Sequence, residues 1–501
     1  MSAAQRAMRL DDLLHGIAEV PRGGDIVVSG LTQDSRSVRG GDAFVALQGA
    51  RAHGIKFAKA AVVQGAVVVL AEKQGAGPSE RGPEEQSNPA PVIWIENLRT
   101  QLGEIAARFF DRPSEAMTLI GVTGTNGKTS SVQLLAQAFT QLGHRAATIG
   151  TLGAGLHGAL QSGERTTPDV ISVHALLAQF RDAGATHIAM EVSSHALDQH
   201  RVDAVAFDVA VFTNLTRDHL DYHRTMEAYG AAKARLFAWP GLRAAVINVD
   251  DAFGRELAAS LPPSSQKLRY AVESEDAELR ASGVRTHADG IDFHLRTPWG
   301  SGPVHSRLLG RFNVANLLAV AGALGALDVS FDQIRGALEM LVPVTGRMNR
   351  LGGGACPLVV VDYAHTPDAL QQALTTLRAH CGGKLICVFG AGGERDAGKR
   401  PQMGAIAESH ADLCIVTDDN PRGEDGDAIV AAILSGFAQP QRVRVMRDRA
   451  RAIALALTEA RAGDVVLIAG KGHEAYQESA GQKRPFDDFA VARSALEERA
   501  C

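Results

Sequence analysis

Cysteine is scarce in this sequence, and the few cysteines follow no pattern typical of a disulfide framework or a metal site. The chain of 501 residues has five cysteines, an odd number, and their spacings are not those of zinc ligands. We therefore expect reduced thiols and a cytoplasmic location. Cys387 and Cys414 each lie in an apolar run, which predicts simple core packing for both.

The chain also lacks an excess of positive charge and any long apolar run. Its net charge is -5, and its 45% hydrophobic and 21% charged residues are typical of an ordinary globular protein. The first 19 residues mix charged and short apolar groups and contain no secretory core. No run approaches the roughly 18 apolar residues of a membrane span. We expect neither a nucleic-acid partner nor membrane insertion.

The length exceeds what one hydrophobic core usually supports. We expect three domains, at residues 1–113, 114–342 and 343–501. Strand runs alternate with helical patterns, which predicts an α/β fold with mainly parallel sheets, except for an antiparallel stretch at 268–308. A segment rich in proline, glycine, serine and glutamate at 74–91 predicts a loop. The parallel strand candidates are residues 42–47, 66–70, 91–95, 118–123, 187–192, 209–214, 245–249, 358–362, 384–389, 413–417 and 465–468.

The clearest motif is an apolar strand, a glycine-rich turn and the opening of a helix at residues 118–130. Glycines let the backbone approach phosphate oxygens, Lys128 supplies positive charge, and the Thr129 hydroxyl suits a magnesium ion. The general pattern has a glycine where this chain has Val122, so we predict a variant phosphate-binding loop. A glycine-rich turn that binds no ligand would not require a strand before it and a helix after it. The predicted nucleotide contacts are Gly124, Thr125, Asn126, Gly127, Lys128, Thr129 and Ser130.

Polar residues follow the next two strand candidates. Glu191 ends the run at 187–192, and His219 lies a few residues after the run at 209–214. Parallel neighbours would bring both to the edge of the sheet that holds the phosphates. We expect Glu191 and His219 to hold magnesium with Thr129, directly or through water.

Lys233 shares one face of a predicted helix at 226–239 with Met226, Tyr229 and Leu236, and so points inward. A buried ammonium is costly unless it is paired or chemically altered. From these residues alone, a lysine that reaches solvent or pairs with a carboxylate remains an equal alternative.

Taken together, these motifs resemble the Mur ligases, the ATP-dependent enzymes that build the peptide of bacterial cell-wall precursors. The resemblance covers nearly the whole chain and includes the variant loop at Val122. The similar motifs are Gly124-Thr-Asn-Gly-Lys-Thr129, Glu191-Val-Ser-Ser-His195, Thr213-Asn-Leu-Thr-Arg-Asp-His219, Gly310-Arg-Phe-Asn-Val-Ala-Asn316, Gly346-Arg-Met348 and Asp362-Tyr-Ala-His365.

The resemblance implies an N-terminal domain that binds a UDP-linked substrate, a central P-loop domain for ATP, and a C-terminal Rossmann-like domain. It implies that Lys233 is carbamylated, as an N6-carboxylysine that helps to hold magnesium, and that Lys128, Lys233 and His219 are catalytic. It also implies ATP contacts at Asn316, Arg347, Asp362 and His365. The implied contacts to UDP-N-acetylmuramoyl-L-alanyl-D-glutamate are Gln33, Ser35, Ala50, Arg51, Ala52, Arg165, Thr166, Thr167, Ser193, Gln199 and Arg201.

Within the family, Asp419-Asn-Pro-Arg422 is similar to members that add meso-diaminopimelate. Guanidinium binds carboxylate in a bidentate fork, whereas the ammonium of an incoming lysine would be repelled by Arg422. The resemblance therefore implies a monomeric, ADP-forming ligase of peptidoglycan synthesis, with consequences for cell shape and division. The implied contacts to diaminopimelate are Arg395, Asp419, Asn420, Pro421, Arg422, Gly470 and Glu474.

Three alternatives remain from the sequence. A lysine-adding ligase of the same family is disfavoured by Arg422. A folylpolyglutamate synthase resembles only the last two domains, and its P-loop lies nearer the N-terminus. A nucleotide-dependent switch that makes no bond would not need substrate-binding positions in three domains.

Overall fold

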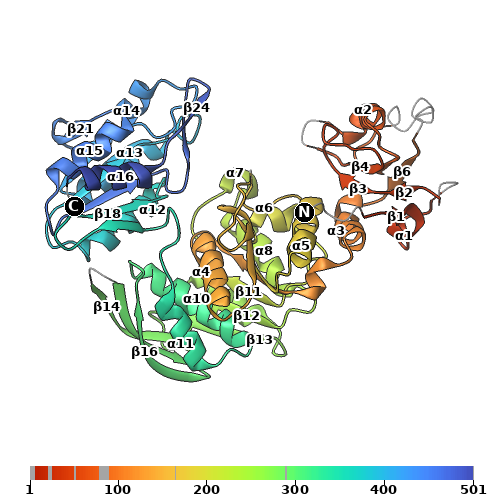
Figure 1. Cartoon of the computed structure of the whole chain (residues 1–501), viewed down its shortest axis with the longest axis horizontal. Coiled ribbons are helices and arrows are strands. Elements are labelled where there is room, and N and C mark those ends of the chain that lie inside the picture. Colours follow the sequence, from red (N-terminus) through yellow and green to blue (C-terminus); the bar gives the residue numbers. More distant parts are fainter. Residues whose placement is uncertain are drawn as a thin grey trace. The chain divides into compact units, whose positions relative to one another are not determined.

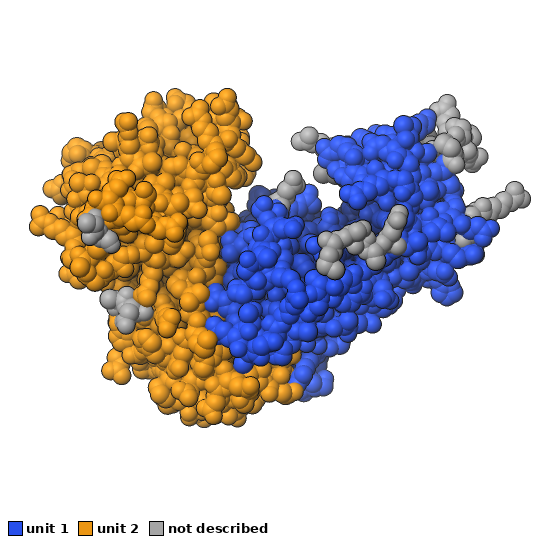
Figure 2. Space-filling view, viewed as in Figure 1, with its two compact units in different colours: residues 1–269 blue, residues 270–501 orange. Residues whose placement is uncertain are grey.

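The computed structural model describes residues 6–20, 25–49, 52–77, 90–163, 165–287 and 290–499. It divides into two compact units, residues 1–269 and 270–501 (Figure 2). Ala50 and Arg51, for which we predict substrate contacts, lie outside the described residues, as does most of the predicted loop at 74–91. The three domain boundaries stay a prediction.

The first unit begins with a parallel four-stranded sheet in the order β3-β4-β5-β6 (Figure 1). Successive residues of a strand point to opposite faces of this sheet, and both faces are apolar. In β4, Ala43 and Val45 pack with α1 and α3, whereas Phe44 and Ala46 pack with α2. A sheet covered on both faces needs apolar residues at nearly every position, which explains the continuous apolar runs. The elements are β1 (Met8–Arg9), α1 (Leu10–Leu14), β2 (Val27–Val28), β3 (Gly30–Thr32), β4 (Asp42–Ala46), η1 (Gly54–Phe57), α2 (Ala58–Val63), β5 (Val68–Glu72), β6 (Val92–Ile95), α3 (Leu98–Phe109) and η4 (Pro113–Ala116).

The rest of the first unit is a sheet in the order β13-β12-β11-β7-β10-β8-β9, in which β7 lies between β10 and β11. Both of these neighbours run parallel to β7, so the predicted strands at 187–192 and 209–214 flank the strand of the glycine-rich loop. The elements are β7 (Thr118–Thr123), α4 (Lys128–Gln141), β8 (Ala146–Gly150), β9 (Gly153–Leu156), α5 (Val170–Asp182), β10 (His187–Glu191), α6 (Ser194–Asp198), β11 (Val209–Phe212), α7 (Leu220–His223), α8 (Met226–Ala234), η5 (Arg235–Ala238), β12 (Ala244–Asn248), α9 (Ala252–Ser260) and β13 (Gln266–Ala271), whose last two residues belong to the second unit.

The second unit contains three antiparallel strands between residues 279 and 306, as expected for most of the stretch at 268–308. Residues 268–271 differ from the expectation, because they belong to β13, which pairs in parallel with the next strand. It continues with two helices and a six-stranded sheet in the order β17-β18-β22-β19-β20-β21. The elements are β14 (Leu279–His287), β15 (Gly290–Thr297), β16 (Gly300–Ser306), α10 (Phe312–Ala326), α11 (Phe331–Met340), β17 (Asn349–Gly352), β18 (Leu358–Asp362), α12 (Pro367–Arg378), β19 (Leu385–Phe389), α13 (Lys399–His410), β20 (Leu413–Val416), α14 (Gly426–Leu434), η6 (Pro440–Arg442), β21 (Arg444–Val445), α15 (Arg449–Glu459), β22 (Val465–Ala469), β23 (Tyr476–Ser479), β24 (Gln482–Pro485) and α16 (Asp488–Glu498).

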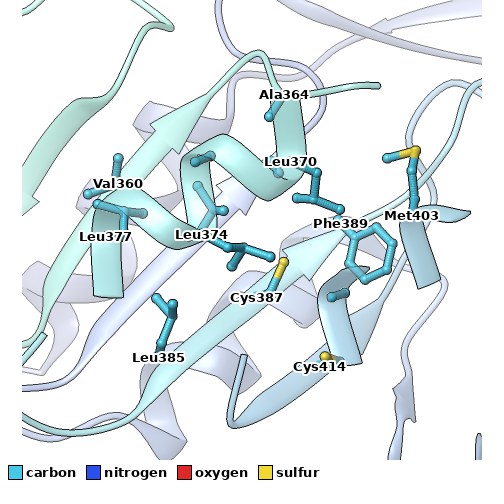
Figure 3. Packing of buried hydrophobic residues seen from close by; sticks show 14 of the residues in the cluster. Val360, Ala364, Leu370, Leu374, Leu377, Leu385, Cys387, Phe389, Met403 and Cys414 are labelled. Atoms are coloured by element: carbon cyan, nitrogen blue, oxygen red, sulfur yellow. The ribbon is translucent and has the colours of Figure 1, made fainter. Parts of the chain in front are cut away.

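Helices cover both faces of this six-stranded sheet. Side chains of α12, α13 and α14 pack with one face, and those of α15 and α16 pack with the other. Cys387 and Cys414 are register partners on β19 and β20, and both thiols lie in the first of these cores (Figure 3). The core packing predicted for both cysteines is confirmed. This doubly covered parallel sheet confirms the Rossmann-like α/β class.

The predicted strands agree with the observed ones to within about two residues at each end. One helix differs: the expected helix at 226–239 ends as α8 at Ala234 and continues as the 3-10 turn η5. Within the described ranges, no helix combines the length and apolar character needed to cross a membrane.

Candidate active site

The glycine-rich loop lies at the carboxyl end of β7. Gly124 has φ of 146°, and a Cβ there would collide with Thr213 Oγ1, while Gly127 has φ of 83° at the start of α4. Both positions therefore favour glycine. Val122 is fully buried within β7, so an apolar side chain suits the place where the general pattern has glycine.

Two residues after β11 hold this loop in shape. The Asn214 carbonyl accepts from Thr125 N at 2.8 Å, and Asn214 Oδ1 accepts from Asn126 N at 2.9 Å. Thr213 Oγ1 donates to the Asn126 carbonyl at 2.6 Å. We did not predict these roles, although both residues belong to a quoted motif. Their position directly after a strand that neighbours β7 was the available signal.

Glu191 and Thr129 meet as predicted. Glu191 is buried at the end of β10, and its Oε2 accepts from Thr129 Oγ1 at 3.1 Å. Thr151, which the sequence did not single out, donates to the same carboxylate from its backbone N at 2.7 Å and its Oγ1 at 3.2 Å. Hydroxyl and carboxylate oxygens are the donor type that magnesium prefers.

Lys233 points into the protein, as the helix pattern predicted. Its side chain is about 1% exposed, and Nζ donates to the Gly124 carbonyl at 2.7 Å. Nζ also lies 4.3 Å from the centre of the Tyr229 ring. Burial, reinforced by the positive charge of Lys128, holds the pKa of Lys233 well below its usual value. Lys233 forms no ion pair with any described carboxylate and does not reach solvent, so both alternatives considered for this lysine are excluded.

The Tyr229 hydroxyl reaches the loop from the same helix, 3.2 Å from Thr125 Oγ1. His219 lies near it, within a group of aromatic rings: the His219 ring centre is 4.8 Å from that of His195 and 6.0 Å from that of Tyr229. Partial burial lowers the pKa of His195 to about 4, with a further contribution from His219. Neutral imidazoles offer lone pairs to a cation or proton donor.

A second polar group adjoins Glu191. Thr167 Oγ1 donates to the Glu191 carbonyl at 2.9 Å and accepts from Ser193 N at 3.2 Å. Arg201 donates to the Thr167 carbonyl at 3.0 Å and, through Nε, to Gln199 Oε1 at 3.1 Å. The structure therefore brings together four of the predicted substrate residues.

Two more predicted residues join this group. Thr166 Oγ1 lies 3.0 Å from Thr151 Oγ1. Burial, with the charge of Arg165, lowers the pKa of Arg201. Two guanidinium groups that repel each other would gain from an anionic ligand.

The remaining predicted substrate residues of the first unit lie on the N-terminal sheet. Ser35 and Gln33 follow β3, and Ala52 follows β4. Because β3 and β4 are parallel neighbours, these segments share the carboxyl edge of the sheet. Asp34 accepts from Arg36 N and Nε, both at 2.9 Å, and so fixes the turn that carries Ser35.

Four of the predicted ATP contacts belong to the second unit, and three of these four gather at the end of β18. The Arg347 guanidinium lies 4.8 Å from the centre of the Tyr363 ring, and its charge acts on the partly buried Asp362. Burial nevertheless raises the pKa of Asp362. His365 Nδ1 lies 2.8 Å from the Tyr363 carbonyl. Asn316 is the fourth residue, buried on α10 and bonded to Asn313 at 2.8 Å.

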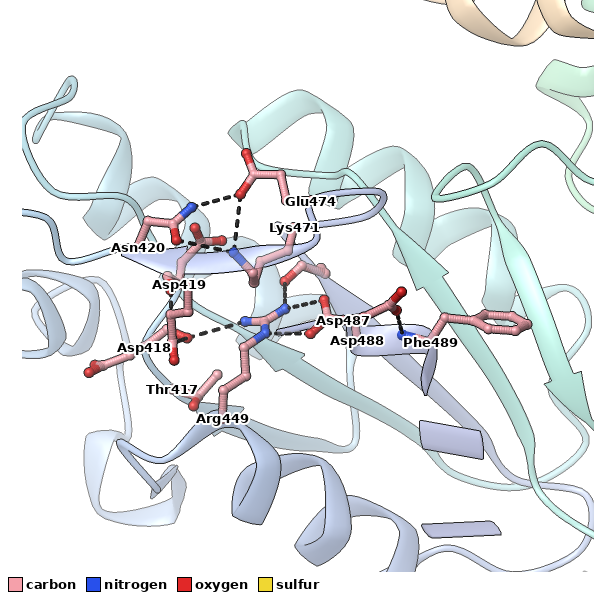
Figure 4. Close-up of polar contacts among 12 residues, drawn as sticks. Thr417, Asp418, Asp419, Asn420, Arg449, Lys471, Glu474, Asp487, Asp488 and Phe489 are labelled. Atoms are coloured by element: carbon pink, nitrogen blue, oxygen red, sulfur yellow. Dashed lines mark hydrogen bonds and ion pairs between the residues drawn. The ribbon is translucent and has the colours of Figure 1, made fainter. Parts of the chain in front are cut away.

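The predicted amino-acid-binding residues follow β19, β20 and β22, which are neighbours in the sheet. Asn420 Nδ2 donates to Glu474 Oε2 at 2.7 Å. Lys471, fully buried, donates from Nζ to Asn420 Oδ1 and Glu474 Oε2, both at 3.1 Å (Figure 4). The sequence did not predict this lysine, although it lies between two predicted residues. Asp419 is buried against Gly470, where a Cβ would collide with its carboxylate.

Arg422 lies beside the loop that follows β19. Its Nη1 donates to the Gly393 carbonyl at 2.7 Å, and its backbone is left-handed with φ of 55°. The Cβ position of Gly392 lies 2.9 Å from Arg422 Nη1 and 3.7 Å from Arg395 Cγ, so both predicted arginines flank this glycine. The Arg422 side chain is about 19% exposed, and its Nε lies 3.9 Å from Glu478 Oε2. The guanidinium thus has one short hydrogen bond to a carbonyl and one longer contact with a carboxylate.

Arg449 ties two of these loops to the C-terminal helix. It donates to the Ala469 carbonyl at 3.0 Å and to the Asp418 carbonyl at 3.4 Å (Figure 4). It also forms two bonds of 2.7 Å with Asp488, and neither side chain is exposed. We did not predict this pair, because its two residues are far apart along the chain.

We expect Asp488→Ala to lower the free energy of unfolding by about 3–5 kcal/mol, because it leaves a buried guanidinium without its counter-charge. Equilibrium urea unfolding followed by circular dichroism measures this. Glu459→Ala is the matched control, since it removes the partner of Arg444 from an ion pair that is 43% and 38% exposed. Glu459→Ala should lower the free energy of unfolding by at most about 1 kcal/mol. Equal losses in the two variants would contradict the role of burial.

Comparison with known proteins agrees with this geometry. Three family profiles match successive parts of the chain: "Mur ligase family, catalytic domain" at residues 27–110, "Mur ligase middle domain" at 122–324 and "Mur ligase, glutamate ligase domain" at 346–472. The chain is 59% identical over 493 residues to the UDP-N-acetylmuramoyl-L-alanyl-D-glutamate--2,6-diaminopimelate ligase of Xanthomonas campestris pv. campestris (strain 8004), covering 98% of each chain.

Solved structures show similarity over most of the chain. A structure of a UDP-N-acetylmuramoyl-L-alanyl-D-glutamate--2,6-diaminopimelate ligase matches 99% of this chain and 100% of its own, with a TM-score of 0.74 and 36% identity. A folylpolyglutamate synthase from Mycobacterium tuberculosis, complexed with ADP and AMPPCP, matches 74% of this chain and 92% of its own, with a TM-score of 0.59 and 20% identity. That second likeness shows the fold alone. The full-length identity to the first relative establishes the relationship: the chain belongs to the Mur ligase family.

Proposed function

We propose that the protein is an ATP-dependent ligase that adds meso-diaminopimelate to the D-glutamate of UDP-N-acetylmuramoyl-L-alanyl-D-glutamate in peptidoglycan synthesis. The observation that carries the proposal is the group at the carboxyl ends of β19, β20 and β22. There Asn420 and Glu474 are bonded to each other, and Arg422 donates to the Gly393 carbonyl and lies 3.9 Å from Glu478 Oε2. On ligand binding, its guanidinium fork would receive the distal carboxylate of the amino acid. The name of the relative that is 59% identical over nearly the full length supports the same acceptor.

The chemistry follows from the weakness of a carboxylate as an electrophile. A carboxylate oxygen of the dipeptide substrate attacks the γ-phosphorus of ATP, which gives an acyl phosphate and ADP. The amine of diaminopimelate then attacks the acyl carbon, loses a proton and expels inorganic phosphate. The protein's part is to position the reactants and to stabilise negative charge. Lys128 Nζ donates to the Gly124 and Thr125 carbonyls, both at 2.9 Å, and with the amides at the start of α4 it would contact phosphate oxygens when ATP binds.

The proposed metal is magnesium, and the described residues fit it. The Thr129 hydroxyl and the Glu191 carboxylate are 3.1 Å apart and offer hard oxygen ligands, with His219 near the same loop. Bound magnesium would offset negative charge on the phosphates.

Carbamylation of Lys233 is part of the proposal. The low pKa of Lys233 favours the neutral amine, which can attack carbon dioxide to form a carbamate and release one proton. The carbamate replaces a buried neutral amine by a negative group, which suits a cation held by Thr129 and Glu191.

The other predicted contacts complete the assignment. Ser35, Gln33 and residues 50–52 are assigned to the UDP part, and the group around Thr167 and Arg201 to the muramoyl dipeptide. Asn316, Arg347, Asp362 and His365 are assigned to the nucleotide. We propose three domains, at residues 1–113, 114–342 and 343–501, and a monomeric cytoplasmic enzyme, consistent with free thiols at the described cysteines.

A reconstituted assay tests the proposal. Purified protein with ATP, magnesium, UDP-N-acetylmuramoyl-L-alanyl-D-glutamate and meso-diaminopimelate should release phosphate and form the UDP-linked tripeptide, detected by mass spectrometry. Absence of both products would defeat it. Phosphate release that does not depend on the acceptor would instead favour a regulatory ATPase, and equal use of L-lysine would favour the lysine-adding alternative.

A further inference from the structure

Three side chains that could hold a metal ion meet on the antiparallel strands β14, β15 and β16, and none of them is among the residues assigned above. They are His287, Asp292 and His305, one from each strand. Asp292 lies between the two histidines, with Oδ2 at 2.8 Å from His287 Nε2 and Oδ1 at 2.6 Å from His305 Nδ1. The three ligand atoms lie within 4.8 Å of one another.

The strands fix this arrangement. Asp292 and His305 are direct register partners on β15 and β16. Along β15 the residues on either side of Asp292, Ile291 and Phe293, point into the core, so Asp292 must face outward. His287 ends β14, where its carbonyl accepts from His380 Nδ1 at 2.6 Å. The backbones that carry the three side chains are therefore held before any ligand binds.

The three side chains already converge on one carboxylate. His287 Nε2 is shielded from solvent and lies 2.8 Å from Asp292, which it helps to hold in the ionised form. The hydrogen bond from His305 lowers the pKa of Asp292, so its carboxylate is ionised near neutral pH. The side chains of Asp292 and His305 are 41% and 52% exposed, which leaves room for water to complete a coordination shell.

We propose that His287, Asp292 and His305 form a binding site for a divalent transition metal of the zinc class. Two imidazole nitrogens and one carboxylate oxygen, with solvent in the fourth position, match the donors and the tetrahedral number that zinc prefers. The ion takes the place of the proton that now links His305 to Asp292. Ligand atoms at about 2.0–2.1 Å from a tetrahedral ion lie roughly 3.4 Å apart. The two histidine–aspartate contacts of 2.8 and 2.6 Å must therefore widen to admit the ion, a change within the reach of rotamer adjustment.

This site differs from the proposed magnesium site in residues and in donor type. Magnesium prefers oxygen ligands, whereas imidazole nitrogen favours zinc, copper and nickel. Because the ion would join three strands, binding should also stabilise the folded protein.

Isothermal titration of the full-length protein with Zn²⁺, in buffer that contains saturating Mg²⁺, tests the site. We expect one zinc ion per chain at this site and a rise in the unfolding temperature of at least about 2 °C in excess zinc. Asp292→Asn and His305→Asn, which retain the size and polarity of the residues, should each weaken this binding more than tenfold, since even outer-shell partners contribute about 10–100-fold.

His294→Ala is the matched control, because His294 is an exposed histidine on the same strand, two residues from Asp292. This variant should bind zinc as the wild type does. Co²⁺ provides a second readout: its visible d–d bands should appear without thiolate charge transfer and should disappear in His305→Asn. Unchanged affinity in both site variants, equal weakening in His294→Ala, or a thiolate band would each overturn the proposal.

Discussion

Lys233→Ala is expected to lower the rate of ligation by at least about a hundredfold, the scale seen when a fixed group that stabilises charge is removed from an active site. Lys233 Nζ lies 2.7 Å from the carbonyl of Gly124, in the phosphate-binding loop, so its modified form would act beside the reacting phosphates. Phosphate release with all three substrates measures the loss. For the wild-type protein, activity should fall when carbon dioxide is removed and return with bicarbonate, whereas the variant should not respond.

Stability separates this role from a merely structural one. Lys233→Met keeps most of the buried alkyl volume that Lys233→Ala removes, so it should lose activity in the same way while changing the free energy of unfolding by less than about 1.5 kcal/mol. If stability fell in step with activity, Lys233 would be a structural residue. A crystal structure of an active, metal-bound enzyme with an unmodified amine at this position would count against carbamylation.

Arg422→Ala is expected to raise the KM for meso-diaminopimelate by about 10–100-fold, the equivalent of about 1.5–3 kcal/mol for a charged hydrogen bond. The KM for ATP should stay within about twofold, because the lost interaction is with the acceptor's distal carboxylate. L-Lysine lacks that carboxylate, so its use should not decline. The measurement is the ratio of kcat/KM values for the two acceptors, and equal effects on diaminopimelate and ATP would contradict the assignment.

Arg422 also holds a loop, and this second role needs its own control. Its Nη1 donates to the Gly393 carbonyl at 2.7 Å. Arg400 supports the same region, since it pairs with Glu424 at 2.7 Å and donates to the Gly392 carbonyl at 3.3 Å, but it is 3% exposed. Arg400→Lys should therefore affect both acceptors alike. A change in acceptor preference that Arg400→Lys reproduced would assign the effect to loop geometry.

Much of the candidate site was predictable because its residues follow strands. Apolar runs identify the strands, and in a parallel sheet the residues after neighbouring strands meet at one edge. Glu191 and Thr129 were paired on this reasoning, and their oxygens lie 3.1 Å apart. The inward direction of Lys233 followed from helical periodicity, and the structure confirms it.

The residues that support the site were not predictable in the same way. Thr213 and Asn214 fix the phosphate-binding loop, and Lys471 joins Asn420 to Glu474. Each acts through contacts with segments distant in the chain, and no local period reports such contacts. The unpredicted cluster on β14, β15 and β16 likewise depends on strand register.

The sequence by itself determined the α/β class and the family, and it predicted the phosphate-binding loop and the residues that we propose to carry the chemistry. Local spacing suffices for these, because hydrophobic period, glycine position and charge can be read along the chain. Only the tertiary structure decided which strands are neighbours, how Arg449 and Asp488 come to share a buried bond, and that no carboxylate of the described residues pairs with Lys233. Those outcomes depend on long-range packing and on solvent exclusion, and both arise only when distant segments fold together.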